Sequence, residues 1–292
     1  MSERAYRFHV DEPLPEGVAR IARGRFDHAI EELDGSSDST PAEAVHNARK
    51  DIKKLRSLIR LVRGELGPER AREENAALRD AAELLSGARD ADVMVETLDG
   101  LELPLAAYGR LRQALEAHRI RTAGGARGQA AAQAVEALSA ARARVVDWPL
   151  ERDSFAVVSA GLRRGYRRGR RELKEVRREA TIETLHEWRK RVKDLWYHHE
   201  LLRFVWRPVM AAVADEAHEL ANHLGDEHDL AMLLAWAREH AEAPPELVEA
   251  VDARRAGLQA DALLLGARLY SESPGDFVSR IESWWEAARR AP

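Results

Sequence analysis

Two stretches of the chain, residues 46–63 and 186–203, combine an apolar helical face with a cationic one. At about 100° per residue, Ile52, Leu55 and Ile59 fall on one side of a helix formed by the first stretch. An arc of roughly 100° on the other side carries His46, Arg49, Lys50, Lys53, Ser57 and Arg60. Solvated helix faces usually mix the two signs of charge, but this stretch has seven Lys or Arg residues and one acid. Such a self-repelling helix favours an anionic partner.

The second stretch repeats the first at an offset of 140 residues. The matched polar positions are His46 with His186, Arg49 with Arg189, Lys50 with Lys190, and Lys53 with Lys193. Two further pairs of segments correspond: Phe26 and Leu33 with Tyr166 and Leu173, and residues 85–90 with residues 224–229 at an offset of 139. An offset that is constant to one residue over three segments indicates an internal duplication.

The periodicity and the turn residues between periodic segments predict a chain made of helices. We expect an irregular arm followed by helices at about 16–33, 41–64, 69–86, 90–99, 104–121, 126–147, 153–179, 181–206, 209–224, 228–241, 245–270 and 277–290. Thr40, Pro41 and Glu43 predict a capping box at the start of the first cationic helix. No segment shows sustained alternation of polar and apolar residues, so no sheet is expected.

The predicted fold class is therefore all-α, with two antiparallel helical bundles related by the duplication through a pseudo-twofold axis. Residues 1–15 would form the N-terminal arm, residues 16–150 the first bundle and residues 151–292 the second. The two cationic helices would face each other across a basic central cavity.

Composition places the chain among soluble, mostly helical proteins, with 33% charged and 6% aromatic residues. It has no cysteine, which excludes disulfides and thiol chemistry. No apolar run reaches the length of a membrane span, and the first residues do not resemble a secretory signal. We therefore expect a cytoplasmic protein without a membrane partner.

Charge is segregated along the chain, although the net charge is only −4. Residues 46–63, 161–178 and 186–203 together carry a charge of +15, so the remaining residues carry −19. The middle window contains a third cationic helix, in which Arg163, Arg167, Arg170 and Lys174 lie, together with Arg177, within an arc of roughly 80°. We expect these residues to extend the anion-binding surface. In the first half, Arg23 matches Arg163, but Asp27 stands where Arg167 would be, which predicts an asymmetric site.

No motif for catalysis or metal binding is present. The chain lacks His-Glu-x-x-His, Gly-x-Ser-x-Gly and Walker-type sequences, and the five-residue spacing of His218, His223 and His228 points them to different helix faces. We therefore expect no catalytic residue, no metal site and no cofactor. For His46 and His186, a neutral hydrogen-bonding role and direct contact with a ligand both stay open; phosphates nearby would hold such a histidine protonated.

The motif H-x-x-R-K-x-x-K-K-L-R at 46–56, its second copy at 186–196 and the Leu-Ser-Gly-Ala-Arg-Asp segment at 85–90 resemble the CHAD domain, the conserved-histidine α-helical domain. The resemblance spans roughly residues 15–290 and implies a stand-alone, two-bundle protein that binds inorganic polyphosphate in a basic cavity. In the second copy, Asp194 and Trp196 replace Lys54 and Arg56, so the two halves need not contribute equally.

The function that the sequence predicts is non-catalytic binding of inorganic polyphosphate, in the cytoplasm and at polyphosphate granules where these form. The expected binding residues are Arg23, His46, Arg49, Lys50, Lys53, Arg56, Arg60, Arg163, Arg167, Arg170, Lys174, His186, Arg189, Lys190, Lys193 and Tyr197. Two alternatives stay open: a nucleic-acid-binding protein and a phosphohydrolase that processes polyphosphate. Nucleic acid is less favoured because aromatic residues do not alternate with the cations, Tyr197 excepted. The sequence leaves the oligomeric state open.

Overall fold

The computed structural model describes residues 5–85, 87–122, 126–241 and 243–290, and within these ranges all regular structure is helical. The all-α prediction is confirmed. The helices are α1 (Leu14–Asp34), α2 (Pro41–Leu61), α3 (Arg63–Leu66), α4 (Pro68–Leu84), α5 (Gly87–Asp99), α6 (Leu105–Thr122), α7 (Ala126–Ala143), the 3₁₀ turn η1 (Arg144–Asp147), α8 (Ala156–Arg178), α9 (Ile182–Leu201), the 3₁₀ turn η2 (Arg203–Trp206), α10 (Arg207–His240), α11 (Pro245–Leu269) and α12 (Pro274–Arg290). Searched over these described residues, no helix is long and apolar enough to cross a membrane.

The two cationic helices, α2 and α9, begin with matching caps. The hydroxyl oxygen of Thr40 accepts the amide hydrogen of Glu43, and the Glu43 carboxylate accepts that of Thr40, which is the predicted capping box. At the start of α9, Thr181 and Thr184 make the same reciprocal pair of bonds. Both helices therefore begin at a position that the local sequence determines.

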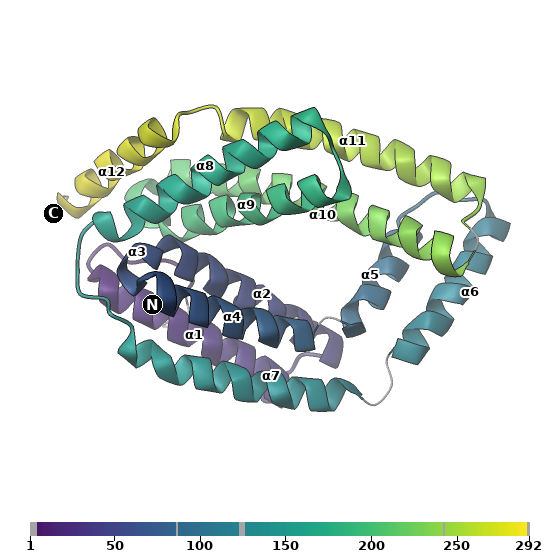
Figure 1. Ribbon diagram of the computed structural model, residues 1–292, viewed down its shortest axis with the longest axis horizontal. Helices are drawn as coiled ribbons and strands as arrows, with labels where there is room; N and C mark the ends of the chain where they lie inside the picture. The colour runs from purple at the N-terminus through teal and green to yellow at the C-terminus, as the bar shows by residue number, and fades with distance from the viewer. Residues whose placement is uncertain (1–4, 86, 123–125, 242, 291–292) are drawn as a thin grey trace.

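The helices form two groups that meet along α2 (Figure 1). On one side α2 packs against α1 and α4, and on the other it packs against α8 and α9. The hairpin of α5 and α6 lies at the right of Figure 1 and contacts α10, which also packs along α9 and α11. The cationic faces of α2 and α9 thus come from distant parts of the sequence to one region of the fold.

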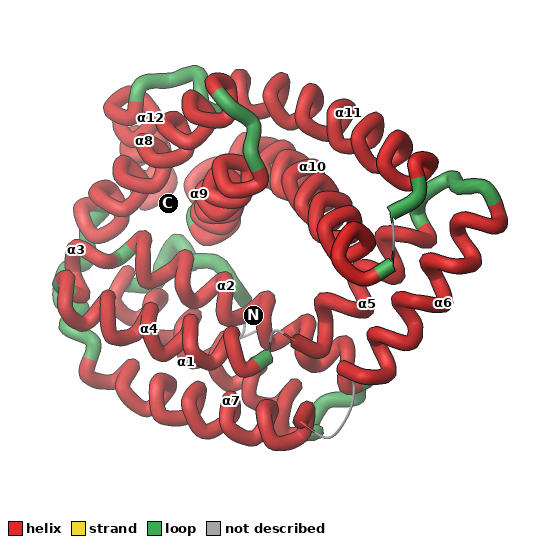
Figure 2. Tube along the Cα trace, turned by 45° about the vertical axis from the view of Figure 1, so that its right-hand side comes forward, coloured by secondary structure: helices red, strands yellow, loops and turns green. Residues whose placement is uncertain are grey.

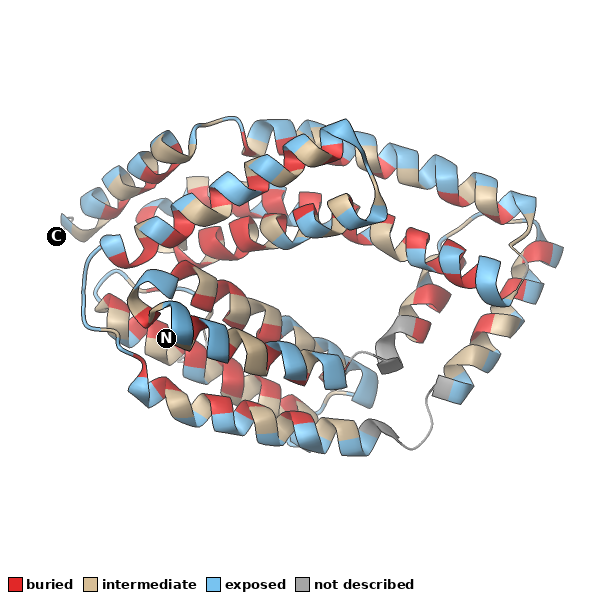
Figure 3. Ribbon diagram, viewed as in Figure 1, coloured by how far each residue is buried: buried red, intermediate tan, exposed pale blue. Residues whose placement is uncertain are grey.

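Buried residues lie mainly on the inner sides of the helices, and exposed residues mainly on the outer sides (Figure 3). The larger hydrophobic core draws on both halves of the chain, including Phe26, Leu58, Trp188 and Leu220. A second core joins α5 and α6 to α10 and α11. The hydrophobic interior therefore links residues on both sides of residue 150, and the division of the chain into bundles at that residue stays a prediction.

The segment from Arg207 to His240 is one continuous helix, α10, and the two separate helices predicted at 209–224 and 228–241 are wrong (Figure 2). Gly225 directly follows the helix end predicted at residue 224. It lies inside α10, where a Cβ would stand 2.8 Å from a guanidinium nitrogen of Arg189. Because Gly225 has no side chain, the Arg189 side chain of α9 can lie close to the backbone of α10. In the first half, α4 and α5 are separate helices, and the internal duplication stays an interpretation of the sequence.

Candidate anion-binding site

A cavity of about 1020 Å³ lies between α2, α9 and α10, with contributions from α4 and α5. Among the described residues, ten Lys and Arg side chains line it, against four carboxylates. The cations are Arg49, Lys50, Lys53, Arg56, Arg60, Arg79, Arg189, Lys190, Arg191 and Lys193, and the carboxylates are Glu187, Asp226, Asp229 and Glu239. The acidic chain as a whole thus encloses a strongly cationic cavity.

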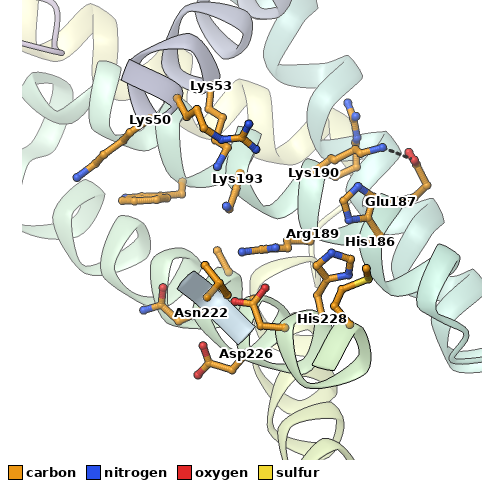
Figure 4. Close-up of a pocket in the computed structure, with 18 of the residues that line it drawn as sticks. Lys50, Lys53, His186, Glu187, Arg189, Lys190, Lys193, Asn222, Asp226 and His228 are labelled. Carbon is orange, nitrogen blue, oxygen red and sulfur yellow. Dashed lines mark hydrogen bonds and ion pairs between the residues drawn. The ribbon is translucent and has the colours of Figure 1, made fainter. Parts of the chain in front are cut away.

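The repeated motifs supply two walls of this cavity (Figure 4). Lys50 and Lys53 extend from α2, whereas Arg189, Lys190 and Lys193 extend from α9. Residues of α10, among them Asn222, Asp226 and His228, form a third wall (Figure 4). A linear anion in this space would meet ammonium and guanidinium groups from several directions.

One buried carboxylate holds two of the arginines that line the cavity. The Asp194 carboxylate lies 2.5 Å from the Arg60 guanidinium and 3.0 Å from that of Arg191. Burial acts to raise the pKa of Asp194, but the charges of Arg60, His198 and Arg191 outweigh it and lower the pKa. Asp194 is therefore ionised, and it holds two cavity arginines while cancelling only one of their charges. The sequence showed Asp194 as a departure from the first motif, and the structure shows why an acid stands there.

The rings of His186 on α9 and His228 on α10 lie next to each other in the cavity lining, with centroids 5.0 Å apart. Burial, together with the charges of Lys190, His228 and Arg189, lowers the pKa of His186 to about 4. His186 is therefore neutral near pH 7 among these cations, and only an added anion would favour its protonated form. His46, in the first turns of α2, is exposed and also lines the cavity.

Lys54 belongs to the same cationic stretch of sequence but does not line the cavity. Its ammonium lies over the Tyr6 ring, 5.2 Å from the centroid. Burial lowers the pKa of Lys54 to about 8, with Arg25 and Lys50 adding to the effect and Asp51 opposing it. Lys54 thus packs against the N-terminal arm. Asp51, the single acid of the stretch, is buried and pairs with Arg25 and His28.

Eleven of the sixteen residues predicted to bind the anion line the cavity. They are His46, Arg49, Lys50, Lys53, Arg56, Arg60, His186, Arg189, Lys190, Lys193 and Tyr197. The structure does not bring the other five into it: Arg23 is exposed on α1, and Arg163, Arg167, Arg170 and Lys174 lie on α8 away from the cavity.

The rotation of α8 about its axis explains where its predicted residues lie. The Tyr166 hydroxyl donates to the Leu269 carbonyl at 3.0 Å, and the Tyr166 ring stacks on Phe277 with centroids 4.0 Å apart. Arg170 on the same side donates to the Glu272 carbonyl at 2.6 Å. These contacts turn this side of α8 toward the end of α11 and the start of α12. They join residues about a hundred positions apart, so local periodicity could not predict them.

Several lining residues carried no usable signal in the sequence. Arg79 enters from α4, and Trp196, His218 and His228 enter from α9 and α10. Arg191 lies inside the second motif, but Asp51 occupies the matching position of the first, so the repeat did not single it out. The side chains of Arg89 and Asp90, part of the motif at 85–90, lie outside the described residues. Among described residues, no group of three or more His, Asp or Glu could hold a metal ion.

Residues 20–238 match the family model of the CHAD domain. The chain belongs to the CHAD domain family. The match runs from α1 into α10 and contains every described cavity-lining residue except Glu239. The cavity thus lies within the matched part of the chain, while α11 and α12 lie beyond the matched residues.

Two solved structures are similar to this CHAD domain. The crystal structure of the CHAD domain from the plant Ricinus communis superimposes with a TM-score of 0.66 at 19% sequence identity, covering 98% of this chain and 96% of that one. PptA from Streptomyces chartreusis superimposes with a TM-score of 0.56 at 13% identity, covering 96% of this chain and all of that one. At such low identities the likeness shows a shared fold. No curated protein matches the chain.

Proposed function

We propose that this CHAD domain binds inorganic polyphosphate in the cavity between α2, α9 and α10. The observation that carries the proposal is the excess of ten cations over four carboxylates among the described lining residues, with both repeated motifs on the walls. Polyphosphate presents a negative charge at each phosphate and no bases, so recognition requires arrays of Arg and Lys. The cavity supplies such arrays from two helices that face each other.

The aromatic lining residues support polyphosphate over nucleic acid. Trp196 stacks on His218 with ring centroids 3.9 Å apart, and its ring also stacks with Tyr197 at 4.7 Å. Trp236 stacks on His240 at 5.5 Å. Proteins that hold single strands use open aromatic faces on which bases stack, whereas these rings already pack against neighbouring rings. The acidic charge outside the cationic windows also disfavours the backbone of duplex DNA.

We further propose that the cavity binds its ligand without chemical change. Hydrolysis of a phosphoanhydride needs a positioned nucleophile and neutralisation of charge at the reacting phosphorus, in most enzymes by metal ions. The carboxylates nearest to such a role are Asp226 and Asp229 on α10. Among the described residues, these two carboxylates do not belong to any group of three or more His, Asp or Glu that could hold a metal ion.

Calorimetry with long-chain polyphosphate, tripolyphosphate and duplex DNA, each at two salt concentrations, tests the proposal. We expect long-chain polyphosphate to bind most tightly, and log K to fall with log[salt] by about 0.7–0.9 for each phosphate contact, by analogy with nucleic acids. A response to salt that is nearly flat would contradict binding through the cationic walls. DNA that displaces polyphosphate would favour the nucleic-acid alternative. Phosphate release from polyphosphate in the presence of Mg²⁺ would favour the phosphohydrolase.

A further inference from the structure

The cations of α8 point in two directions. Arg163 and Arg170 lie on the side that faces α11 and α12, as Tyr166 and its contacts determine. The other side, with Arg164 and Arg168, lies against the C-terminal end of α2 and against α9. Arg164 donates from its guanidinium to the Arg60 carbonyl at 3.1 Å.

The crossing of α8 over α2 is close and therefore well defined. A Cβ at Gly161 would overlap the carbonyl of Leu61, and one at Gly165 would lie 3.4 Å from the His198 ring. Glycine at these two positions lets the helix backbones approach. The short helix α3 also packs against α8, near the same crossing, and it carries Arg63.

The cations on this side continue those of the cavity. Arg60 and Arg191 line the cavity and share the Asp194 carboxylate. Burial, followed by the charges of Arg191 and Arg171, lowers the pKa of Arg168. Burial, followed by the charges of Arg63 and Arg168, lowers the pKa of Arg164. The guanidinium groups therefore follow one another closely from the cavity wall at Arg60 and Arg191 to the outer surface of α8.

Few carboxylates balance this row. Asp194 is already shared by Arg60 and Arg191, and Arg171 pairs with its neighbour Glu172 at 2.5 Å. Arg63, Arg168 and Arg171 are exposed, so a bound chain could reach them. A row of exposed, mutually repelling arginines that begins at the wall of an anion site provides a path for further anionic groups.

We propose that Arg63, Arg164, Arg168 and Arg171, here called the α8 track, form a second segment of the binding site that holds the part of a long polyphosphate chain leaving the cavity past Arg60 and Arg191. This inference rests on the proposed function and adds selection by chain length. A short chain neutralises only cavity cations, whereas a long chain also neutralises the track. The affinity of the protein for polyphosphate therefore rises with chain length beyond the number of phosphates that the cavity holds.

The test compares two double variants of the same helix that remove the same charge: R168A/R171A in the track and R163A/R177A on the side away from it. All four arginines are exposed. Alanine favours a helix at least as strongly as arginine does, so α8 should stay helical in both variants. Calorimetry is carried out with long-chain polyphosphate and with tripolyphosphate. We expect R168A/R171A to weaken long-chain binding by roughly tenfold or more, because two charge-assisted contacts are lost. The slope of log K against log[salt] should become shallower by about 1.5, because the counterions that these two contacts release are no longer released.

In the same experiment we expect tripolyphosphate binding by R168A/R171A to match the unchanged protein, and R163A/R177A to bind both ligands nearly as the unchanged protein does. Equal losses in the two variants would show a diffuse effect of charge and would overturn the track. So would unchanged long-chain binding by R168A/R171A. If cavity variants abolish binding while both α8 variants bind normally, the track fails and the proposed function holds. If the unchanged protein binds no polyphosphate, both fail.

Discussion

At the scale of single residues, the cavity depends on a histidine whose charge state is set by its neighbours and on arginines whose positions are set by theirs. His186 is kept neutral by burial and by adjacent cations, and Arg60 and Arg191 are held in place by Asp194. Replacing the buried Asp194 would leave two guanidiniums without their shared anion, which is costly in a partly buried position. The binding surface is therefore ordered by a carboxylate that itself has little access to ligand.

Polyphosphate binding should take up protons through His186. Its pKa is about 4 beside Lys190 and Arg189 on α9 and His228 on α10, with Glu187 opposing them. Phosphates near the ring favour the imidazolium and raise this pKa, so affinity falls as the pH rises through the raised value. We expect tighter binding at about pH 6 than at about pH 8.

Calorimetry in two buffers of different ionisation enthalpy measures the proton uptake directly. His186→Asn should reduce it, whereas His240→Gln, outside the cavity lining, should leave it unchanged. The same uptake in the His186 variant and the unchanged protein would assign the protons to other groups.

The buried histidines His198 and His199 should make the fold sensitive to acid. They are 3% and 1% exposed, and burial lowers the pKa of each to about 4. The unfolded chain binds these protons at its ordinary pKa near 6.5, so the stabilisation is complete above that pH and is lost as the pH falls toward 4. On this basis, each histidine makes the free energy of unfolding at about pH 4 up to about 3 kcal/mol smaller than it is above pH 6.5.

Thermal unfolding followed between about pH 8 and pH 4 checks the expectation. His198→Asn and His199→Asn should each flatten the fall in melting temperature below pH 6.5, while His240→Gln on the exposed end of α10 should not. A melting temperature that stays constant over this range would contradict the assignment.

At the scale of whole helices, glycines decide how closely the walls of the site approach. Gly225 admits the Arg189 side chain against α10, and Gly161 admits the backbone of α2 against α8. The two positions differ in what an added methyl group would meet. At Gly225 it meets the end of a flexible side chain, whereas at Gly161 it meets a main-chain carbonyl.

Gly225→Ala and Gly161→Ala should therefore separate binding from stability. We expect Gly225→Ala to displace Arg189 and weaken polyphosphate binding, with a melting temperature equal to or above that of the unchanged protein, because alanine favours a helix interior by about 1 kcal/mol. Gly161→Ala should lower the melting temperature, because the α2–α8 crossing must open. Calorimetry and thermal unfolding measure the two effects, and a large loss of stability in Gly225→Ala would contradict the role given to this glycine.

At the scale of the whole molecule, the binding site joins the two halves of the chain. Lys53 on α2 and Lys193 on α9 line the same cavity, so the site exists only when the halves pack together through their common core. The cost of gathering these cations opposes folding, and a bound polyanion offsets it.

K53E/K193E should consequently lose most of its affinity for polyphosphate while keeping or raising its melting temperature. R72E/R110E, which reverses two exposed arginines of α4 and α6 outside the cavity lining, is the matched control and should bind normally. Arg142 and Arg144 are unsuitable controls, because they pair with Asp27 and with the buried Glu74. Unfolding of K53E/K193E would mean that these lysines are structural, and normal binding would place the polyphosphate elsewhere.

The sequence by itself determined the helical class, the start of α2 with its capping box, and the two matched cationic stretches at 46–63 and 186–203. Eleven residues that were predicted to bind the anion within these stretches line the cavity. Each of these features follows from hydrophobic periodicity or helix capping, which depend on residues within one turn or one helix and can therefore be predicted from neighbouring residues. The repeat added one long-range inference, that α2 and α9 contribute equivalent walls.

Only the tertiary structure decided the rotation of α8, the continuity of α10 and the role of Asp194. Tyr166 bonds to Leu269 across 103 residues, and Arg60 pairs with Asp194 across 134. Gly225 could end a helix or admit Arg189, and only the packing of α9 against α10 distinguishes the two. These features depend on which side chains meet after folding, and local sequence preferences carry no information about such distant partners.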